Sequence, residues 1–117
     1  MITAVETKLR FKENPDSWKT ALWDFVGDFR KQKNPTAITD PFELGDERKD
    51  AVLASSIETL CDELKIDIPE WLYEIPSCKH PYFVAGDDDL MAIAIVQSPV
   101  RFRIRKVFVL ENFLFRV

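Results

Sequence analysis

Two long stretches of the chain repeat apolar residues at the spacing of an amphipathic α-helix, and this constrains the fold more than any other feature. Side chains three and four positions apart share one helix face, so each stretch must bury that face. We therefore predict helices over residues 16–33 and 46–64. The first stripe consists of Trp18, Leu22, Phe25, Val26 and Phe29, and the second of Val52, Leu53, Ile57, Leu60, Cys61 and Leu64.

The charged residues of the second stretch are expected at its start and on its outer face, where Asp50 and Glu58 fall. A shorter helix over residues 1–11 is predicted to dock through Ile2, Val5 and Leu9, which lie three and four positions apart.

Two more helices complete the predicted set. Pro69 suits the first turn of a short helix in which Trp71 and Leu72 pack inward. Residues 87–97 contain "MAIAIV" and are apolar nearly all round. A helix without a polar face is usually buried on all sides, so we predict that this one is central.

These elements indicate one compact domain over residues 1–117. With 117 residues, 46% hydrophobic and 31% charged, the chain has the size and composition of a single globular domain. We predict a mainly α fold, a bundle of three to five helices with a short extended or β-like C-terminal segment. The longest apolar run has seven residues, too short to cross a membrane, and no signal peptide is apparent, so a cytoplasmic protein is expected.

The stretch "SPVRFRIRKVFV" admits two readings. With a period of two, residues 100–105 alternate apolar and basic, as in a strand. With a helical period, Ser98 caps the helix and Pro99 takes its first position. We favour a short helix over residues 99–105, followed by an extended segment because "KVFV" is β-branched and aromatic.

The same stretch is basic, whereas the rest of the chain is acidic. Residues 99–117 hold five basic residues and one acidic residue, a net charge of +4, and the preceding residues hold 11 basic and 19 acidic residues, a net charge of −8. A basic end can bind an anionic partner or fold back onto the acidic body. We favour the second alternative.

Four residues are candidates for partner binding. Arg101, Arg103 and Arg105 could line the rim of an interface, and Trp23 lies off the apolar stripe of its helix. An exposed tryptophan would be a binding anchor, although burial at the edge of the core is the preferred expectation.

No catalytic, cofactor-binding or metal-binding residue is predicted. The acidic run "GDDD" over residues 86–89 is best explained as a helix start, where carboxylates cap free N–H groups and suit the helix dipole. Cys78 and His80 are two positions apart, but no orienting group accompanies them. We therefore do not expect an enzyme.

Three motifs carry a resemblance: "SWKTALWDFVGDF", "PEWLYE", and "HPYFVAG" followed by "LMAIAIVQSPVRFRIRKVFV". With these motifs, roughly residues 16–110 resemble an uncharacterised family of small bacterial proteins often found beside predicted nucleotidyltransferase-type toxins. The resemblance implies an antitoxin-like role, and it transfers no site residue.

The predicted function is therefore a non-enzymatic protein-interaction module, the antitoxin-like partner of a neighbouring nucleotidyltransferase-type toxin. The alternative is a nucleic-acid-binding module that uses residues 99–106. A sequence pI of about 5.0 disfavours this alternative, since an acidic body repels phosphate.

Overall fold

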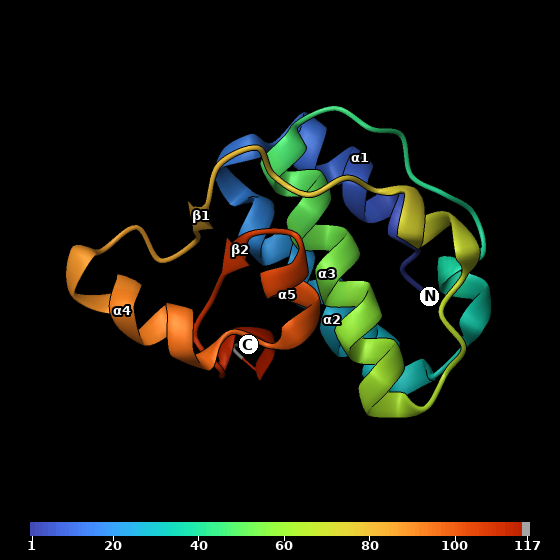
Figure 1. The fold of residues 1–117 in the computed structure, drawn as a ribbon. Helices are drawn as coiled ribbons and strands as arrows, with labels where there is room; N and C mark the ends of the chain where they lie inside the picture. The colour runs from blue at the N-terminus through green and yellow to red at the C-terminus, as the bar shows by residue number, and fades with distance from the viewer. Residues whose placement is uncertain (116–117) are drawn as a thin grey trace.

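The computed structural model describes residues 1–115, and helix α3 (Glu47–Leu64) runs through its centre (Figure 1). Helices α1 (Ala4–Glu13), α2 (Trp18–Gln32) and α5 (Val100–Ile104) pack against α3. Helix α4 (Asp88–Gln97) lies at one side of the molecule and contacts β2. The described chain is thus compact and mainly helical, as predicted.

Two short strands lie among the helices of the described residues. Strands β1 (Tyr82–Phe83) and β2 (Val107–Phe108) pair in parallel. Because parallel strands need a crossover connection, the chain between them forms α4 and α5. Four 3-10 helices occupy other connections: η1 (Pro15–Ser17), η2 (Pro35–Ile38), η3 (Glu70–Glu74) and η4 (Phe113–Phe115).

Local sequence explains where the main helices begin and end. The Thr3 side chain accepts a hydrogen bond from the Glu6 N–H at 3.0 Å, which caps α1. Asp46 caps α3 by accepting from the N–H groups of Arg48 and Lys49 at 3.0 and 3.2 Å. Helices α2 and α3 each end at a lysine in the left-handed region, with φ of 50° and 56°.

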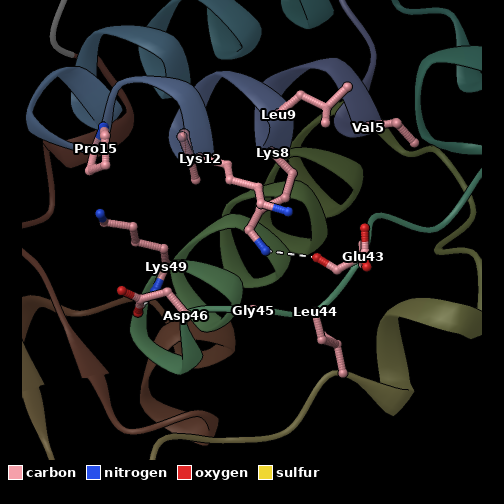
Figure 2. Close-up of a pocket in the computed structure, with 11 residues that line it drawn as sticks. Val5, Lys8, Leu9, Lys12, Pro15, Glu43, Leu44, Gly45, Asp46 and Lys49 are labelled. Carbon is pink, nitrogen blue, oxygen red and sulfur yellow. Dashed lines mark hydrogen bonds between the residues drawn. The ribbon is translucent and has the colours of Figure 1, made fainter.

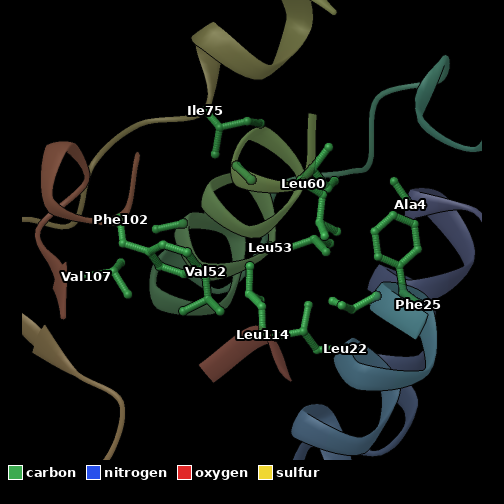
Figure 3. Close-up of a cluster of buried hydrophobic side chains, with 14 of the residues drawn as sticks. Ala4, Leu22, Phe25, Val52, Leu53, Leu60, Ile75, Phe102, Val107 and Leu114 are labelled. Atoms are coloured by element: carbon green, nitrogen blue, oxygen red, sulfur yellow. The ribbon is translucent and has the colours of Figure 1, made fainter. Parts of the chain in front are cut away.

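The two predicted apolar stripes form the core (Figure 3). All five residues of the α2 stripe are buried, and the α3 stripe is buried except for Leu64, which is partly buried. Phe102 of α5 and Val107 of β2 pack into the same cluster from the C-terminal part of the chain. The prediction of two long helices with inward stripes is therefore confirmed.

The side of α3 that was predicted to face solvent is buried along much of the helix. Asp50 and Glu58 are both buried instead of facing solvent. Each carboxylate has a cationic partner from another element, Lys8 for Asp50 and Arg105 for Glu58. Burying an unpaired carboxylate is strongly unfavourable, so Asp50 and Glu58 can be buried only because neighbouring segments supply cationic partners. These pairs allow α3 to be the central helix.

The prediction that residues 87–97 form the most buried helix is wrong. The helix exists as α4, but Ala94 is its one buried residue, and all ten of its positions are described. Residues on either side of α4 are tied to β1 and β2, so the helix lies outside the packed body. The composition of a helix shows that it gains from burial, but its connections decide whether the same chain can cover it.

The docking face of α1 also differs from the prediction. Ala4, Thr7 and Phe11 are buried, whereas Leu9 is exposed and Val5 is half-buried. Phe11 packs edge-on against Trp18, with ring centroids 5.9 Å apart. The buried face is the one whose aromatic ring reaches α2; of the three predicted docking residues, Ile2 packs partly buried against the core, Val5 is half-buried and Leu9 is exposed.

The helix reading of residues 100–105 is confirmed by α5, and the extended segment is confirmed by β2. Ser98 does not cap α5, however. Its buried hydroxyl accepts a hydrogen bond from the Val109 N–H at 2.8 Å. The same hydroxyl donates a hydrogen bond to the Ala94 carbonyl oxygen at 2.5 Å. Ser98 thus joins the end of α4 to the segment after β2.

Within residues 1–115, no helix combines the length and apolar character needed to span a bilayer.

Candidate interaction surface

The arginines of α5 meet carboxylates of α3 at matching intervals. Arg101 donates to Asp62 through Nε at 2.9 Å and through Nη2 at 3.2 Å. Arg105 follows the last residue of α5, four positions after Arg101, and pairs with Glu58, one turn before Asp62 on α3. The two helices therefore run antiparallel with two successive charge-assisted contacts between them.

Arg105 is the more deeply placed of the two. Besides Glu58, its Nη2 donates to the Leu72 carbonyl oxygen at 2.7 Å and its Nε to the Ile75 carbonyl oxygen at 3.2 Å. Only 5% of the residue is exposed. Arg105 therefore joins α3, α5 and the segment around η3, and its burial removes it from the surface predicted for partner binding.

Arg101 is half-buried and committed to Asp62, whose hydrogen bonds raise the pKa of the Arg101 guanidinium. This pair and the Arg105 pair confirm that the basic end folds back onto the acidic body. Arg103 points elsewhere: it is exposed, and its side chain has no hydrogen bond or ion pair to any of the described residues. Of the three arginines, Arg103 is the one that the structure leaves available to a partner.

Trp23 is half-buried and does not stand out as an anchor. Its Nε1–H donates to the Phe113 carbonyl oxygen at 3.0 Å, and the two rings meet edge-on at 6.3 Å between centroids. Trp23 therefore ties α2 to η4, as expected for a tryptophan at the edge of the core.

Large apolar side chains are exposed on α4 and α5, in the region that the sequence assigned to the core. We call these residues the α4–α5 surface. Val96 is 80% exposed and Ile104 is 65% exposed, against 1% for Ala94 on the inner side of α4. At 100° per residue, Ala92 and Val96 lie on the side of α4 opposite Ala94, and Ile93 and Ile95 lie on the two flanks. The members of the surface are Ala92, Ile93, Ile95, Val96, Val100 and Ile104.

Exposed charged residues of both signs flank these apolar residues along the chain. Asp87, Asp88 and Asp89 are exposed at the start of α4, where Asp87 caps the helix by accepting from the Asp89 N–H at 3.0 Å. Exposed Arg103 and Lys106 lie on and just after α5. The predicted capping role of the acidic run is confirmed.

Among residues 1–115, no group of three or more His, Cys, Asp or Glu side chains could hold a metal ion.

A hollow opens between α1 and the start of α3 (Figure 2). Both elements lie away from α4 (Figure 1). It has a volume of about 360 Å³, and Val5, Leu9 and Leu44 contribute its apolar lining. Lys8 donates to the Glu43 carbonyl oxygen at 2.7 Å beside it and also pairs with Asp50. Lysines and carboxylates both line the hollow, so its charge favours no particular class of ligand.

The two thiols are held in their protonated form. Burial raises the pKa of Cys61 to about 11, with nearby Asp62 and Glu58 adding to the shift. Burial also raises the pKa of Cys78, and Cys78 is buried whereas His80 is exposed. A protonated, buried thiol is a poor nucleophile. Cys78 therefore lacks the lowered pKa and the access that an activated cysteine needs.

Comparison with known proteins gave no match: no family model fits the chain, and no curated protein or solved structure is significantly similar to it. The resemblance to small bacterial proteins found beside nucleotidyltransferase-type toxins therefore stays a prediction.

The apolar character of α4 could be read from the sequence, but the prediction placed this helix in the interior. Glu58 and Asp62 were not predicted as the partners of Arg105 and Arg101, although the two carboxylates are four positions apart in the chain, as are the two arginines. The common spacing was the available signal. Such spacing becomes informative only once the two helices are known to be neighbours.

Proposed function

We propose that this protein is a non-enzymatic interaction module that binds another protein through the α4–α5 surface. The observation that supports the proposal is the exposure of this surface, where Val96, Val100 and Ile104 are more than half exposed. Exposed large apolar side chains on two consecutive helices are costly in water, and such side chains are typical of protein interfaces.

The resemblance suggests the kind of partner. In the family that the chain resembles, neighbouring genes often encode predicted nucleotidyltransferase-type toxins, so we propose an antitoxin-like role in the bacterial cytoplasm. An antitoxin of this kind acts by occupying a surface of the toxin and needs no catalytic residue of its own.

Nucleic-acid binding through residues 99–106 is less well supported. Two of the four cations in this stretch, Arg101 and Arg105, are bound to Asp62 and Glu58. Arg103 and Lys106 remain exposed, and the whole chain carries a net charge of −4. Phosphate binding gains from several free cations in one place, so we favour the protein partner.

Co-expression with the protein encoded beside it tests the proposal. The wild-type protein should co-purify with that neighbour as one complex. Val96→Glu should abolish the complex, because a buried unpaired carboxylate is strongly unfavourable. Leu44→Glu is the matched control, since Leu44 is 54% exposed but lines the hollow beside α1. Elution of the wild-type protein and its neighbour as separate species would contradict the proposal, as would equal losses in the two variants.

A further inference from the structure

We propose that the hollow between α1 and the start of α3 binds a small amphipathic carboxylate, such as a medium-chain fatty acid. The hollow lies away from α4, so this inference is independent of the proposed function. Three properties of the described residues carry it: a wall that buried side chains hold in place, an apolar part, and two lysines whose ammonium groups have no partner.

The first property is that one wall of the hollow is fixed from the interior. This wall is the segment 43–46, which leads into α3. Lys8 donates to the Glu43 carbonyl oxygen at 2.7 Å, and the Gly45 N–H donates to the Asp50 carboxylate at 2.8 Å. Lys8 and Asp50 also pair with each other, and their side chains are only 12% and 4% exposed. The wall is therefore already ordered, and a ligand does not have to order it on binding.

The second property is the apolar part of the hollow. Leu9 of α1 and Leu44 of the wall are 50% and 54% exposed, and both line the hollow together with Val5. Its volume of about 360 Å³ is close to the lower end of the range for small-molecule pockets, about 300–1,000 Å³. An alkyl chain of modest length would remove these apolar side chains from water.

The third property is the state of two lysines in the lining. Lys12 of α1 and Lys49 of α3 line the same hollow, and neither ammonium group forms a hydrogen bond or ion pair with any residue of 1–115. By contrast, the neighbouring Arg48 lies over the Tyr82 ring, 5.1 Å from its centroid.

The position of Lys49 is unfavourable unless an anion accompanies it. Lys49 lies in the first turn of α3, and the N-terminal end of a helix carries a partial positive charge. Lys49 is also half-buried, so water screens its charge less than it would at an exposed position. A carboxylate bound beside Lys49 would offset both effects.

The total charge of the lining favours no ligand class, but the charges are not evenly placed. Asp46 caps α3 by accepting from two backbone N–H groups at 3.0 and 3.2 Å, so its carboxylate is already engaged. Figure 2 shows exposed Glu43 at the end of the hollow where Val5 and Leu9 lie, and the two unpartnered lysines at the other end. A headgroup at the lysine end therefore places an alkyl chain along the apolar part. Asp46 lies at the lysine end too and repels a second negative charge, which favours a carboxylate over a phosphate.

Isothermal titration calorimetry at neutral pH tests the proposal with three probes of equal chain length: decanoate, decanol and decylammonium. Each is used below the concentration at which it forms micelles. One decanoate should bind per chain. Decanol should bind about tenfold or more weakly because it lacks the charge, and decylammonium should bind more weakly still, because it meets the lysines with a like charge.

Lys12→Gln/Lys49→Gln tests the headgroup end. This double variant should bind decanoate about tenfold or more weakly than wild type and should bind decanol equally well, since only the charged headgroup is affected. Lys31→Gln/Lys79→Gln is the matched control, because it removes the same charge from two exposed lysines outside the lining. The control should bind decanoate like wild type.

Leu44→Glu tests the apolar end and should weaken the binding of both decanoate and decanol, because it places a carboxylate beside the alkyl chain. Circular dichroism establishes that the three variants retain the wild-type helix content. All the substituted side chains lie at exposed or half-buried positions, so folding should be preserved.

Three results would overturn the inference: a wild-type protein that does not bind decanoate, equal affinities for decanoate and decylammonium, or equal losses of decanoate binding in the two double-lysine variants. None of these measurements involves a second protein. Co-expression with the neighbour therefore tests the proposed function separately, and either proposal can fail while the other holds.

Discussion

Replacing Arg105 by methionine should destabilise the fold strongly while leaving its shape intact. Arg105 lies between α3, α5 and the η3 segment, and the side chains of Arg105 and Glu58 are only 6% and 3% exposed. Methionine retains an unbranched apolar stem and therefore keeps much of the packing. The change removes the cation and leaves the Glu58 carboxylate buried without a partner.

The expected magnitude follows from that burial. Removing one member of a buried ion pair costs about 3–5 kcal/mol of unfolding free energy. The carbonyl groups of Leu72 and Ile75 also lose their donors, which places Arg105→Met in the upper part of that range. Domains of this kind are stable by about 5–15 kcal/mol, so the variant should be close to the limit of folding at room temperature.

The matched control is Arg103→Met, two positions earlier in α5. Arg103 is exposed and makes no side-chain hydrogen bond or ion pair within the described part of the chain, so its loss should change the unfolding free energy by less than about 0.5 kcal/mol. Urea unfolding followed by circular dichroism and by the fluorescence of the three tryptophans measures both values.

Glu58→Gln gives a second route if Arg105→Met does not fold. Glutamine keeps an acceptor for Arg105 but removes the charge, so the loss should be smaller. In a double-mutant cycle, Arg105→Met and Glu58→Gln should show a coupling energy of about 0.5–3 kcal/mol. Equal effects of Arg105→Met and Arg103→Met, or a coupling of zero, would refute the reasoning that the buried pair holds α3 and α5 together.

Two further predictions concern the interior. Ser98→Ala should cost about 1–3 kcal/mol in urea unfolding, because the buried Val109 N–H loses its acceptor at 2.8 Å, whereas the exposed Ser77→Ala should cost almost nothing. The free energy of unfolding should fall as pH rises from 9.0 to about 11, because the Cys61 thiol ionises at its ordinary pKa when unfolded but stays protonated when folded. Cys61→Ala should flatten this part of the curve in urea unfolding at several pH values, and an unchanged slope would contradict the assignment.

Much of the fold could be predicted because it depends on short-range periodicity. The stripe from Trp18 to Phe29 places its side chains on one face wherever α2 lies, and that face is buried. Asp46 and Asp87 were recognisable as helix starts, since a cap needs only N–H groups two or three residues away. The short helix over residues 99–105 and the extended run after it belong to the same class of local inference.

The ion pairs could be predicted only in part. The charge asymmetry indicated that the basic end folds back onto the acidic body, and Arg101 and Arg105 do so. The sequence did not indicate which carboxylates receive them, because Asp62 and Glu58 are separated from their partners by 39 and 47 positions. Only the packing of α5 on α3 selects these two among the acidic side chains of the body.

By itself, the sequence determined that this chain forms amphipathic helices around an aromatic core and that "MAIAIV" gains free energy when it leaves water. The tertiary structure decided where that burial is available. The charges of α3 are neutralised from Lys8 and Arg105, so α3 occupies the centre, and the pairing of β1 with β2 holds α4 outside. The hydrophobic effect is non-directional, so the apolar composition of α4 does not specify what covers the helix. The chain connections on either side of α4 leave most of it exposed instead of in the core.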